Sequence, residues 1–191
     1  MTTQPIHPVR PPVGRPLLPA PRLAAMPRLH ALELLPDEAG CDVVRRDWQA
    51  LRDAGLPSQL DHRGSTNSPH VTLAAAPGIE ADTRQLAAAL FTDLLPTGVR
   101  TSGIALLGGG ERVTLVRLVT VPDALTRSAL ELRSAMPSVE HLGWLPHITL
   151  ARRLDRSDVA RAFSVIARGD VTITLSSLRH WDPDAGIVTF L

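Results

Sequence analysis

The sequence contains few of the residues that several common kinds of site require. Its 191 residues include one cysteine, Cys41, no tyrosine, three phenylalanines and three tryptophans. A single thiol excludes an intramolecular disulfide framework and a cysteine-rich zinc site. It is compatible with a reducing compartment, so we expect a cytoplasmic protein. With so few aromatic rings, few positions are available for stacking on a nucleobase.

Excess charge and long apolar runs are also missing. Twenty basic and nineteen acidic residues give a formal charge of +1. This balance argues against a protein that coats nucleic acid nonspecifically or binds a membrane surface, although it permits a small basic pocket for one phosphate. No apolar run approaches the ~20 residues that a membrane-spanning helix needs, so we expect no membrane partner.

The first 27 residues differ in composition from the rest. Eight of the seventeen prolines lie in residues 1–27, together with three arginines and no acidic residue. Proline removes a backbone donor and interrupts both helices and sheets. We therefore expect residues 1–27 to form a disordered Pro/Arg-rich tail, and residues 28–191 to form the folded domain.

Strand and helix patterns alternate through residues 28–191 and repeat once. The first repeat predicts a strand at 29–35, a helix at 37–54, a strand at 70–75, a helix at 81–95 and a strand at 99–107. The second predicts the same order at 112–120, 122–136, 147–151, 156–167 and 171–180, followed by a short strand at 187–191. We expect an α+β fold: a bilobal, pseudo-twofold duplication of β-α-β-α-β units, with antiparallel sheets around a central cleft. The lobes are expected at about 28–107 and 112–191.

The strongest identity between the repeats lies on their second predicted strands. Pro-His-Val-Thr-Leu-Ala at 69–74 matches Pro-His-Ile-Thr-Leu-Ala at 146–151 at five of six positions. Alternation along a strand places His70 and Thr72 on one face, and His147 and Thr149 on the equivalent face of the second copy. Packing explains a retained Val/Ile position on the inner face, but it does not explain retained His and Thr on the other.

Two histidines and two threonines converging on one cleft suit a phosphodiester. One imidazole can take a proton from water while the other gives a proton to the leaving oxygen. Threonine hydroxyls can donate to the non-bridging phosphoryl oxygens. No carboxylate cluster lies near either motif, and the motif spacing supplies no third metal ligand, so we expect neither a metal nor another cofactor.

The paired His-x-Thr motifs resemble those of the 2H phosphoesterase superfamily, and specifically its 2′-5′ RNA ligase family. The segment Leu-Pro-His-Ile-Thr-Leu-Ala-Arg at 145–152 is especially similar to that family's second motif. The resemblance implies a bilobal fold with a central cleft. It also implies hydrolysis of 2′,3′-cyclic phosphate ends of RNA or nucleotides, with reversible 2′-5′ ligation as a related activity. It assigns one histidine as general base and the other as general acid, without indicating which.

Three further residues are candidates for binding the substrate. Arg152 matches the arginine that follows the family's second motif, whereas regular strand alternation would place Arg153 on the His147 face. Trp144, just before that motif, would line the cleft, stack on a base or pack within its own loop. Two alternatives to the main hypothesis stay open. One is a phosphoesterase for another small cyclic phosphate, and the other is a non-catalytic module that binds RNA or nucleotide ends. We expect the protein to be a monomer.

Overall fold

A computed structural model describes residues 28–191 except 63, 65, 138 and 140–142, so the predicted tail at 1–27 lies outside the described residues. The strands are β1 (His30–Pro36), β2 (Val71–Ala76), β3 (Thr97–Leu107), β4 (Arg112–Thr120), β5 (His147–Asp155), β6 (Val171–Asp182) and β7 (Ile187–Phe190). The helices are α1 (Glu38–Asp53), α2 (Ala81–Phe91), α3 (Asp123–Ser134) and α4 (Val159–Val165). Short 3₁₀ turns are η1 (Gln59–Asp61), η2 (Thr92–Leu94) and η3 (Arg156–Asp158).

The strand order carries the internal repeat into the fold. The sheet runs β2-β1-β6-β3-β4-β5, with β7 paired to β6, and every pairing is antiparallel. The counterparts in the two repeats are β1 and β4, β2 and β5, and β3 and β6. When each strand is replaced by its counterpart, the six-strand order is the same read from the other end. A pseudo-twofold axis therefore passes between β3 and β6, and the predicted α+β duplication with antiparallel strands is confirmed.

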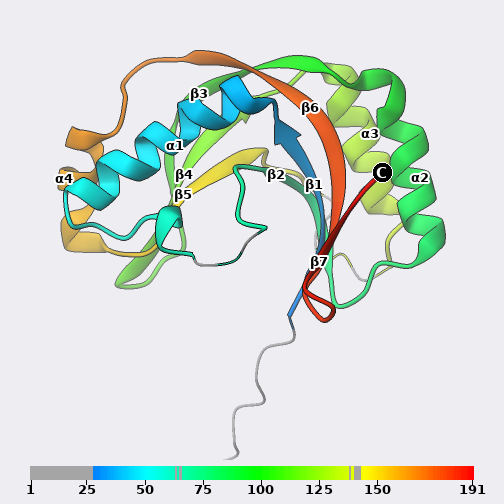
Figure 1. The fold of residues 1–191 in the computed structure, drawn as a ribbon, viewed down its shortest axis with the longest axis horizontal. Coiled ribbons are helices and arrows are strands. Elements are labelled where there is room, and N and C mark those ends of the chain that lie inside the picture. The colour runs from blue at the N-terminus through cyan, green and yellow to red at the C-terminus, as the bar shows by residue number, and fades with distance from the viewer. Residues whose placement is uncertain (1–27, 63, 65, 138, 140–142) are drawn as a thin grey trace, which may run out of the picture.

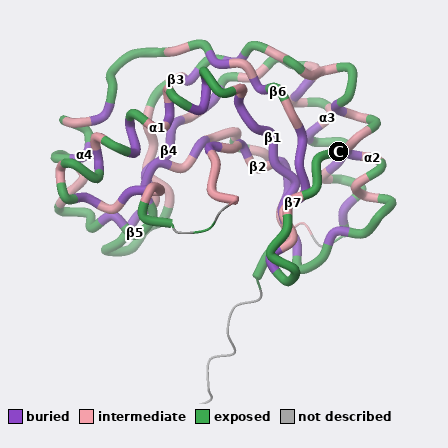
Figure 2. The backbone as a smooth tube through the Cα atoms, in the orientation of Figure 1, coloured by how far each residue is buried: buried purple, intermediate pink, exposed green. Residues whose placement is uncertain are grey.

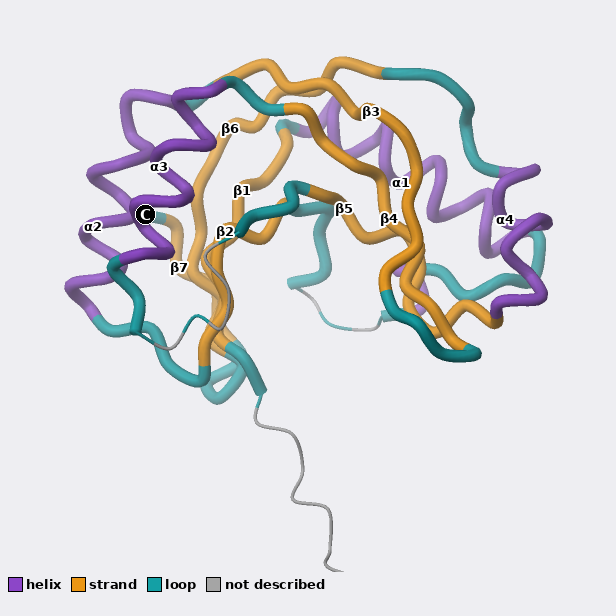
Figure 3. Tube along the Cα trace, turned by 180° about the vertical axis from the view of Figure 1, so that it is seen from behind, coloured by secondary structure: helices purple, strands orange, loops and turns teal. Residues whose placement is uncertain are grey.

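The sheet is one continuous, strongly bent surface. The first part of β6 pairs with β3, from Thr97↔Leu175 to Thr101↔Val171, and the second part pairs with β1. Figures 1 and 3 show the resulting arch, with helices on its outer side: α1 and α4 lie at one end and α2 and α3 at the other. Helix α1 contacts α4 and β5, while α3 contacts α2 and β2. Each end of the arch thus combines elements from both sequence repeats.

Helix α1 shows how local sequence positions one of these layers. The Asp37 side chain caps the helix by accepting the Gly40 N–H at 2.8 Å, and Gly55 takes a positive φ of 66° just beyond the other end. Val44, Trp48 and Leu51 lie on the buried side of the helix. Figure 2 shows buried and exposed segments alternating along α1, as expected for a helix with one face on a sheet.

A buried ion pair joins α1 to the sheet beside the second motif. The Asp47 carboxylate accepts the Arg117 Nε–H at 2.6 Å, and both side chains are only 2% exposed. The same two side chains bind the backbone of Ala167. Arg117 Nη2 donates to the Ala167 carbonyl oxygen at 2.7 Å, and the Ala167 N–H donates to Asp47 Oδ1 at 2.9 Å. Arg117 also lies opposite Ile148 in the β4–β5 ladder, so this network supports the strand that carries His147.

The structure departs from the sequence prediction mainly in the second repeat. Strand β5 continues to Asp155, beyond the predicted end at 151, and the predicted helix at 156–167 is the turn η3 followed by the shorter α4. Asp155, which precedes the predicted helix, makes no side-chain cap and pairs instead with Arg112 Nε at 3.2 Å. None of the helices formed by the described residues has the length and apolar character needed to cross a membrane.

Candidate active site

The two His-x-Thr motifs adopt the same local structure. His70 and Thr72 are half-buried while their neighbours Val71 and Leu73 are buried, and the second motif repeats this pattern. The ladder also shifts at the same place in both copies. Leu73 is an extra residue between the pairs Leu32↔Ala74 and Glu33↔Thr72, and Leu150 is extra between Leu115↔Ala151 and Val116↔Thr149. Such β-bulges are common beside active sites, where they redirect side chains.

Both imidazoles are held through the same nitrogen. His70 Nδ1 lies 2.7 Å from the Ser68 carbonyl oxygen, and His147 Nδ1 lies 2.7 Å from the Leu145 carbonyl oxygen. A carbonyl oxygen only accepts, so each Nδ1 must carry a proton. The neutral form of each ring therefore keeps its lone pair on Nε2, where it can accept a proton.

Two tryptophans hold the motif strands by hydrogen bonds to equivalent carbonyls. The Trp48 indole donates to the Thr149 carbonyl oxygen at 3.0 Å, and the Trp144 indole donates to the Thr72 carbonyl oxygen at 2.9 Å. Strands β2 and β5 stand at opposite ends of the strand order, yet they contact each other because the sheet curls. Trp144, which comes just before the second motif, therefore connects that motif to the first.

A cavity of about 420 Å³ lies beside the first motif. Of the seven residues predicted for the site, His70, Thr72 and Arg152 line it, whereas His147, Thr149, Arg153 and Trp144 do not. The rest of its lining comes from β1 and the residue before it, from η1 and the loop that follows it, and from β2 and β6: Leu29, Ala31, Glu33, Gln59, His62, Thr66, Asn67, Ala75, Arg179 and Trp181. The cavity thus combines two imidazoles and two threonine hydroxyls with two guanidinium groups and the Glu33 carboxylate.

A second bulge in β5 explains why Arg152 reaches this cavity. The register shifts again between the pairs Val113↔Leu154 and Leu115↔Ala151, which leaves Arg152 and Arg153 out of regular alternation. Arg153 has φ 57°, in the left-handed region that non-glycine residues rarely enter. The regular strand assumed in the sequence prediction is therefore interrupted here, and Arg152 shares the cavity with His70 and Thr72.

Sequence reasoning did not find Glu33, Arg179 or Trp181. Glu33 and Arg179 are both buried, and the Arg179 Nε–H donates to Glu33 Oε2 at 2.7 Å. One signal was available, because Glu33 is the single charged residue in the apolar run Ala31–Leu35 and buried charges usually have a role or a partner. Arg179 and Trp181 come from the far end of the chain, and only the β1–β6 pairing brings them to the cavity.

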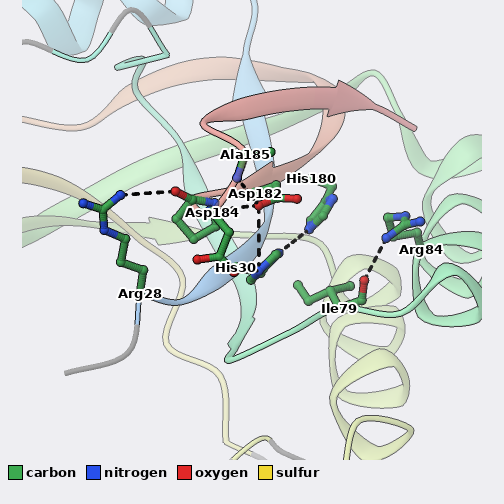
Figure 4. Close-up of polar contacts among 9 residues, drawn as sticks. Arg28, His30, Ile79, Arg84, His180, Asp182, Asp184 and Ala185 are labelled. Atoms are coloured by element: carbon green, nitrogen blue, oxygen red, sulfur yellow. Dashed lines mark hydrogen bonds and ion pairs between the residues drawn. The ribbon is translucent and has the colours of Figure 1, made fainter. Parts of the chain in front are cut away.

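A second polar cluster lies at the β6–β7 turn (Figure 4). His30 Nδ1 is 3.3 Å from His180 Nε2, and His30 Nε2 is 3.2 Å from Asp184 Oδ2. Burial, followed by the positive charge of Arg84, lowers the pKa of His180, which favours a neutral acceptor facing His30. His30 alternates with the cavity-lining Leu29 and Ala31, so the cluster faces away from the cavity.

The same cluster contains the side chains best placed for a metal ion. Among the described residues, the one set of three potential ligand atoms within 4.8 Å of one another belongs to His30, Asp182 and Asp184. Asp182 Oδ1 already accepts the backbone N–H groups of Asp184 and Ala185, and these bonds lower the pKa of its carboxyl group. The His-x-Thr motifs contribute no ligand to this set.

One family model and several solved structures are similar to this chain. A model of the 2′-5′ RNA ligase superfamily matches residues 41–186. The crystal structure of TT0787 from Thermus thermophilus is similar in fold, with a TM-score of 0.53 at 18% identity over 86% of this chain and 95% of that one. Escherichia coli LigT complexed with 3′-AMP gives 0.48 at 15% identity (87% and 95% covered), and Kluyveromyces marxianus Usb1 with uridine monophosphate gives 0.49 at 13% (86% and 98%). No curated protein gives a significant match.

Proposed function

Because the chain belongs to the 2′-5′ RNA ligase superfamily, a family of phosphoesterases and ligases, we propose that it is a metal-independent phosphodiesterase. Its substrates are 2′,3′-cyclic phosphate ends of RNA or nucleotides. The observation that carries the proposal is the matching Nδ1 bond in the two motifs, which gives His70 and His147 the same available nitrogen. Two such nitrogens supply one acceptor and one donor for a displacement at phosphorus.

The reaction balances with these two groups alone. One neutral imidazole takes a proton from water as the water oxygen bonds to phosphorus. The bond from phosphorus to one ribose oxygen breaks, and that oxygen receives a proton from the other, protonated imidazole. The product is a monoester on the neighbouring ribose oxygen, and each histidine ends in the other's starting state. The same course, with the 5′-hydroxyl of a second ribose in place of water and the 3′-oxygen as the leaving group, would form a 2′-5′ linkage.

The phosphate-binding groups follow from the cavity. Thr72 and Thr149 are proposed to donate their hydroxyl hydrogens to the non-bridging oxygens, and Arg152 to neutralise charge that develops there. Arg152 and Arg179 bring two positive charges to the cavity and Glu33 brings one negative charge, although the chain as a whole has a charge of only +1. Trp181 is the aromatic ring best placed to contact the base, since it lines the cavity and Trp144 does not. In this proposal Trp144 supports the first motif strand through its bond to the Thr72 carbonyl oxygen, and Arg153 has no direct role.

A substrate panel tests the proposal. Purified protein is incubated in EDTA with 2′,3′-cyclic nucleotides, RNA ending in a cyclic phosphate, and ADP-ribose 1″,2″-cyclic phosphate, and the products are identified by ³¹P NMR. Turnover of the first two supports the proposal, with a bell-shaped pH profile expected from the two coupled histidines. Turnover of the third alone favours a phosphoesterase for another cyclic phosphate. Binding without any turnover favours a binding module. We further propose that the enzyme is a cytoplasmic monomer.

A further inference from the structure

Glu33 breaks the pseudo-twofold symmetry of the site at one position. It lies opposite Thr72 in the β1–β2 ladder, and the corresponding residue opposite Thr149 in the β4–β5 ladder is Val116. Both residues are buried. The two motifs therefore have the same backbone and the same Nδ1 bond, but the first has a carboxylate beside it where the second has a hydrocarbon side chain.

The carboxylate is directed at the catalytic nitrogen. Glu33 Oε1 lies 3.4 Å from His70 Nε2, while its other oxygen accepts the Arg179 Nε–H at 2.7 Å. Arg179 also donates to the Thr66 carbonyl at 3.2 Å, so the guanidinium is held from two sides. The contact with His70 is longer than a usual charged hydrogen bond of about 2.7–2.9 Å, so it is a weak hold on the Nε2 proton.

Whether the contact between Glu33 and His70 is attractive or repulsive depends on the protonation of His70. Because His70 Nδ1 already donates to Ser68, neutral His70 would turn an Nε2 lone pair towards a carboxylate oxygen, which is repulsive. A protonated ring instead donates from both nitrogens. His147 has the same Nδ1 bond, but the position that corresponds to Glu33 carries no charge. The two rings are thus placed in different electrostatic surroundings by a single residue.

We propose that Glu33 is a positioning residue that orients His70 and retains the proton on its Nε2, so that His70 acts as the proton donor and His147 as the base. Arg179 holds Glu33 in place and moderates its charge. The assignment of donor and base rests on the proposed function, whereas the effect of Glu33 on the His70 proton does not. The other ionisable groups lining the cavity are His62 and Arg152, and they are unchanged in the variants below.

The test is an NMR titration of the histidine rings, which needs no substrate. Signals of His70 and His147 are assigned from His70→Gln and His147→Gln, and midpoints are compared in wild type, Glu33→Gln and Arg179→Gln. Losing the carboxylate should lower the His70 midpoint by about 1 pH unit, and losing the guanidinium should raise it. The His147 midpoint should move in neither variant. A purely structural ion pair would not shift one ring in opposite directions.

A second variant and a pH profile of activity complete the test. If Glu33→Gln does not fold, Glu33→Asp keeps the charge while withdrawing it from His70, and a smaller fall of the His70 midpoint is expected. In the activity assay, the alkaline limb of the pH profile should move to lower pH in Glu33→Gln, which amounts to about a tenfold loss of kcat/KM above that limb. An unmoved His70 midpoint, or equal movement of both rings, overturns the proposal. Absence of wild-type turnover together with the predicted midpoints would overturn only the proposed function.

Discussion

Arg152 and Arg153 are adjacent in sequence and chemically identical, yet the β5 bulge gives them different surroundings. Arg152 lines the cavity with His70 and Thr72, whereas Arg153 is exposed in the left-handed region at φ 57°. A guanidinium that binds a phosphoryl oxygen contributes about 1.5–3 kcal/mol. Arg152→Ala should therefore lower kcat/KM by about 10- to 100-fold, and Arg153→Ala should lower it less than twofold.

Position 152 should matter more for activity, whereas position 153 should matter more for the free energy of unfolding. A side chain in the left-handed region costs about 1–2 kcal/mol, which Arg153→Gly would relieve. The greater backbone entropy of glycine offsets about 0.5–1 kcal/mol of that gain. The free energy of unfolding of Arg153→Gly should therefore rise by about 0–1.5 kcal/mol. Arg153→Val, with a β-branched side chain at positive φ, should lower it by about 1–3 kcal/mol.

The assays are the initial rate of cyclic-phosphate hydrolysis and urea unfolding followed by circular dichroism. Arg152→Ala serves as the matched control for stability, since Arg152 is exposed and its backbone is not left-handed. If Arg153→Ala lost as much activity as Arg152→Ala and Arg153→Val were no less stable than wild type, β5 would be regular at this point and the bulge would be refuted.

Three more predictions concern the base, the buried ion pair and acid stability. Trp181→Ala should lower kcat/KM for a cyclic nucleotide by about 5- to 100-fold relative to ribose 2′,3′-cyclic phosphate, because base stacking contributes about 1–3 kcal/mol; an unchanged ratio would argue against stacking. Arg117→Met should destabilise the fold by about 3–5 kcal/mol because it leaves Asp47 buried without its partner, and the double variant with Asp47→Leu should recover much of this in urea unfolding. Equal loss in both variants would contradict that reasoning. Since burial lowers the pKa of His180 in the folded state, the unfolded chain binds more protons, so stability should fall as pH drops below about 6.5, and His180→Gln should flatten this dependence between pH 5 and 7.5. A slope unchanged by the substitution would exclude His180 as its source.

The sequence was sufficient for the order and type of the elements because their signals are local. Hydrophobic periodicity placed each main helix and strand within a few residues of its observed bounds, and the repeated His-x-Thr hexapeptide identified both motifs. The limits appeared where local signals compete, as at 156–167, where Asp155 binds Arg112 rather than capping a helix.

The remaining features depend on which strands pair and in what register. The bulges at Leu73, Leu150 and Arg152–Arg153 exist only relative to the neighbouring strands, so no single-strand pattern contains them. The contact of Glu33 with Arg179 joins residues 146 positions apart through the β1–β6 pairing. Trp48 and Trp144 occupy unrelated places in the two repeats, and yet they bind equivalent carbonyls, which the internal repeat could not predict.

The most direct test of the account is hydrolysis of 2′,3′-cyclic AMP in EDTA by the wild-type protein, His70→Ala and His147→Ala. The account predicts wild-type turnover without added metal and a loss of about 10²- to 10⁴-fold in each variant, because each removes one proton-transfer group. Wild-type rates in either variant, or wild-type activity that EDTA abolishes, would contradict the two-histidine mechanism.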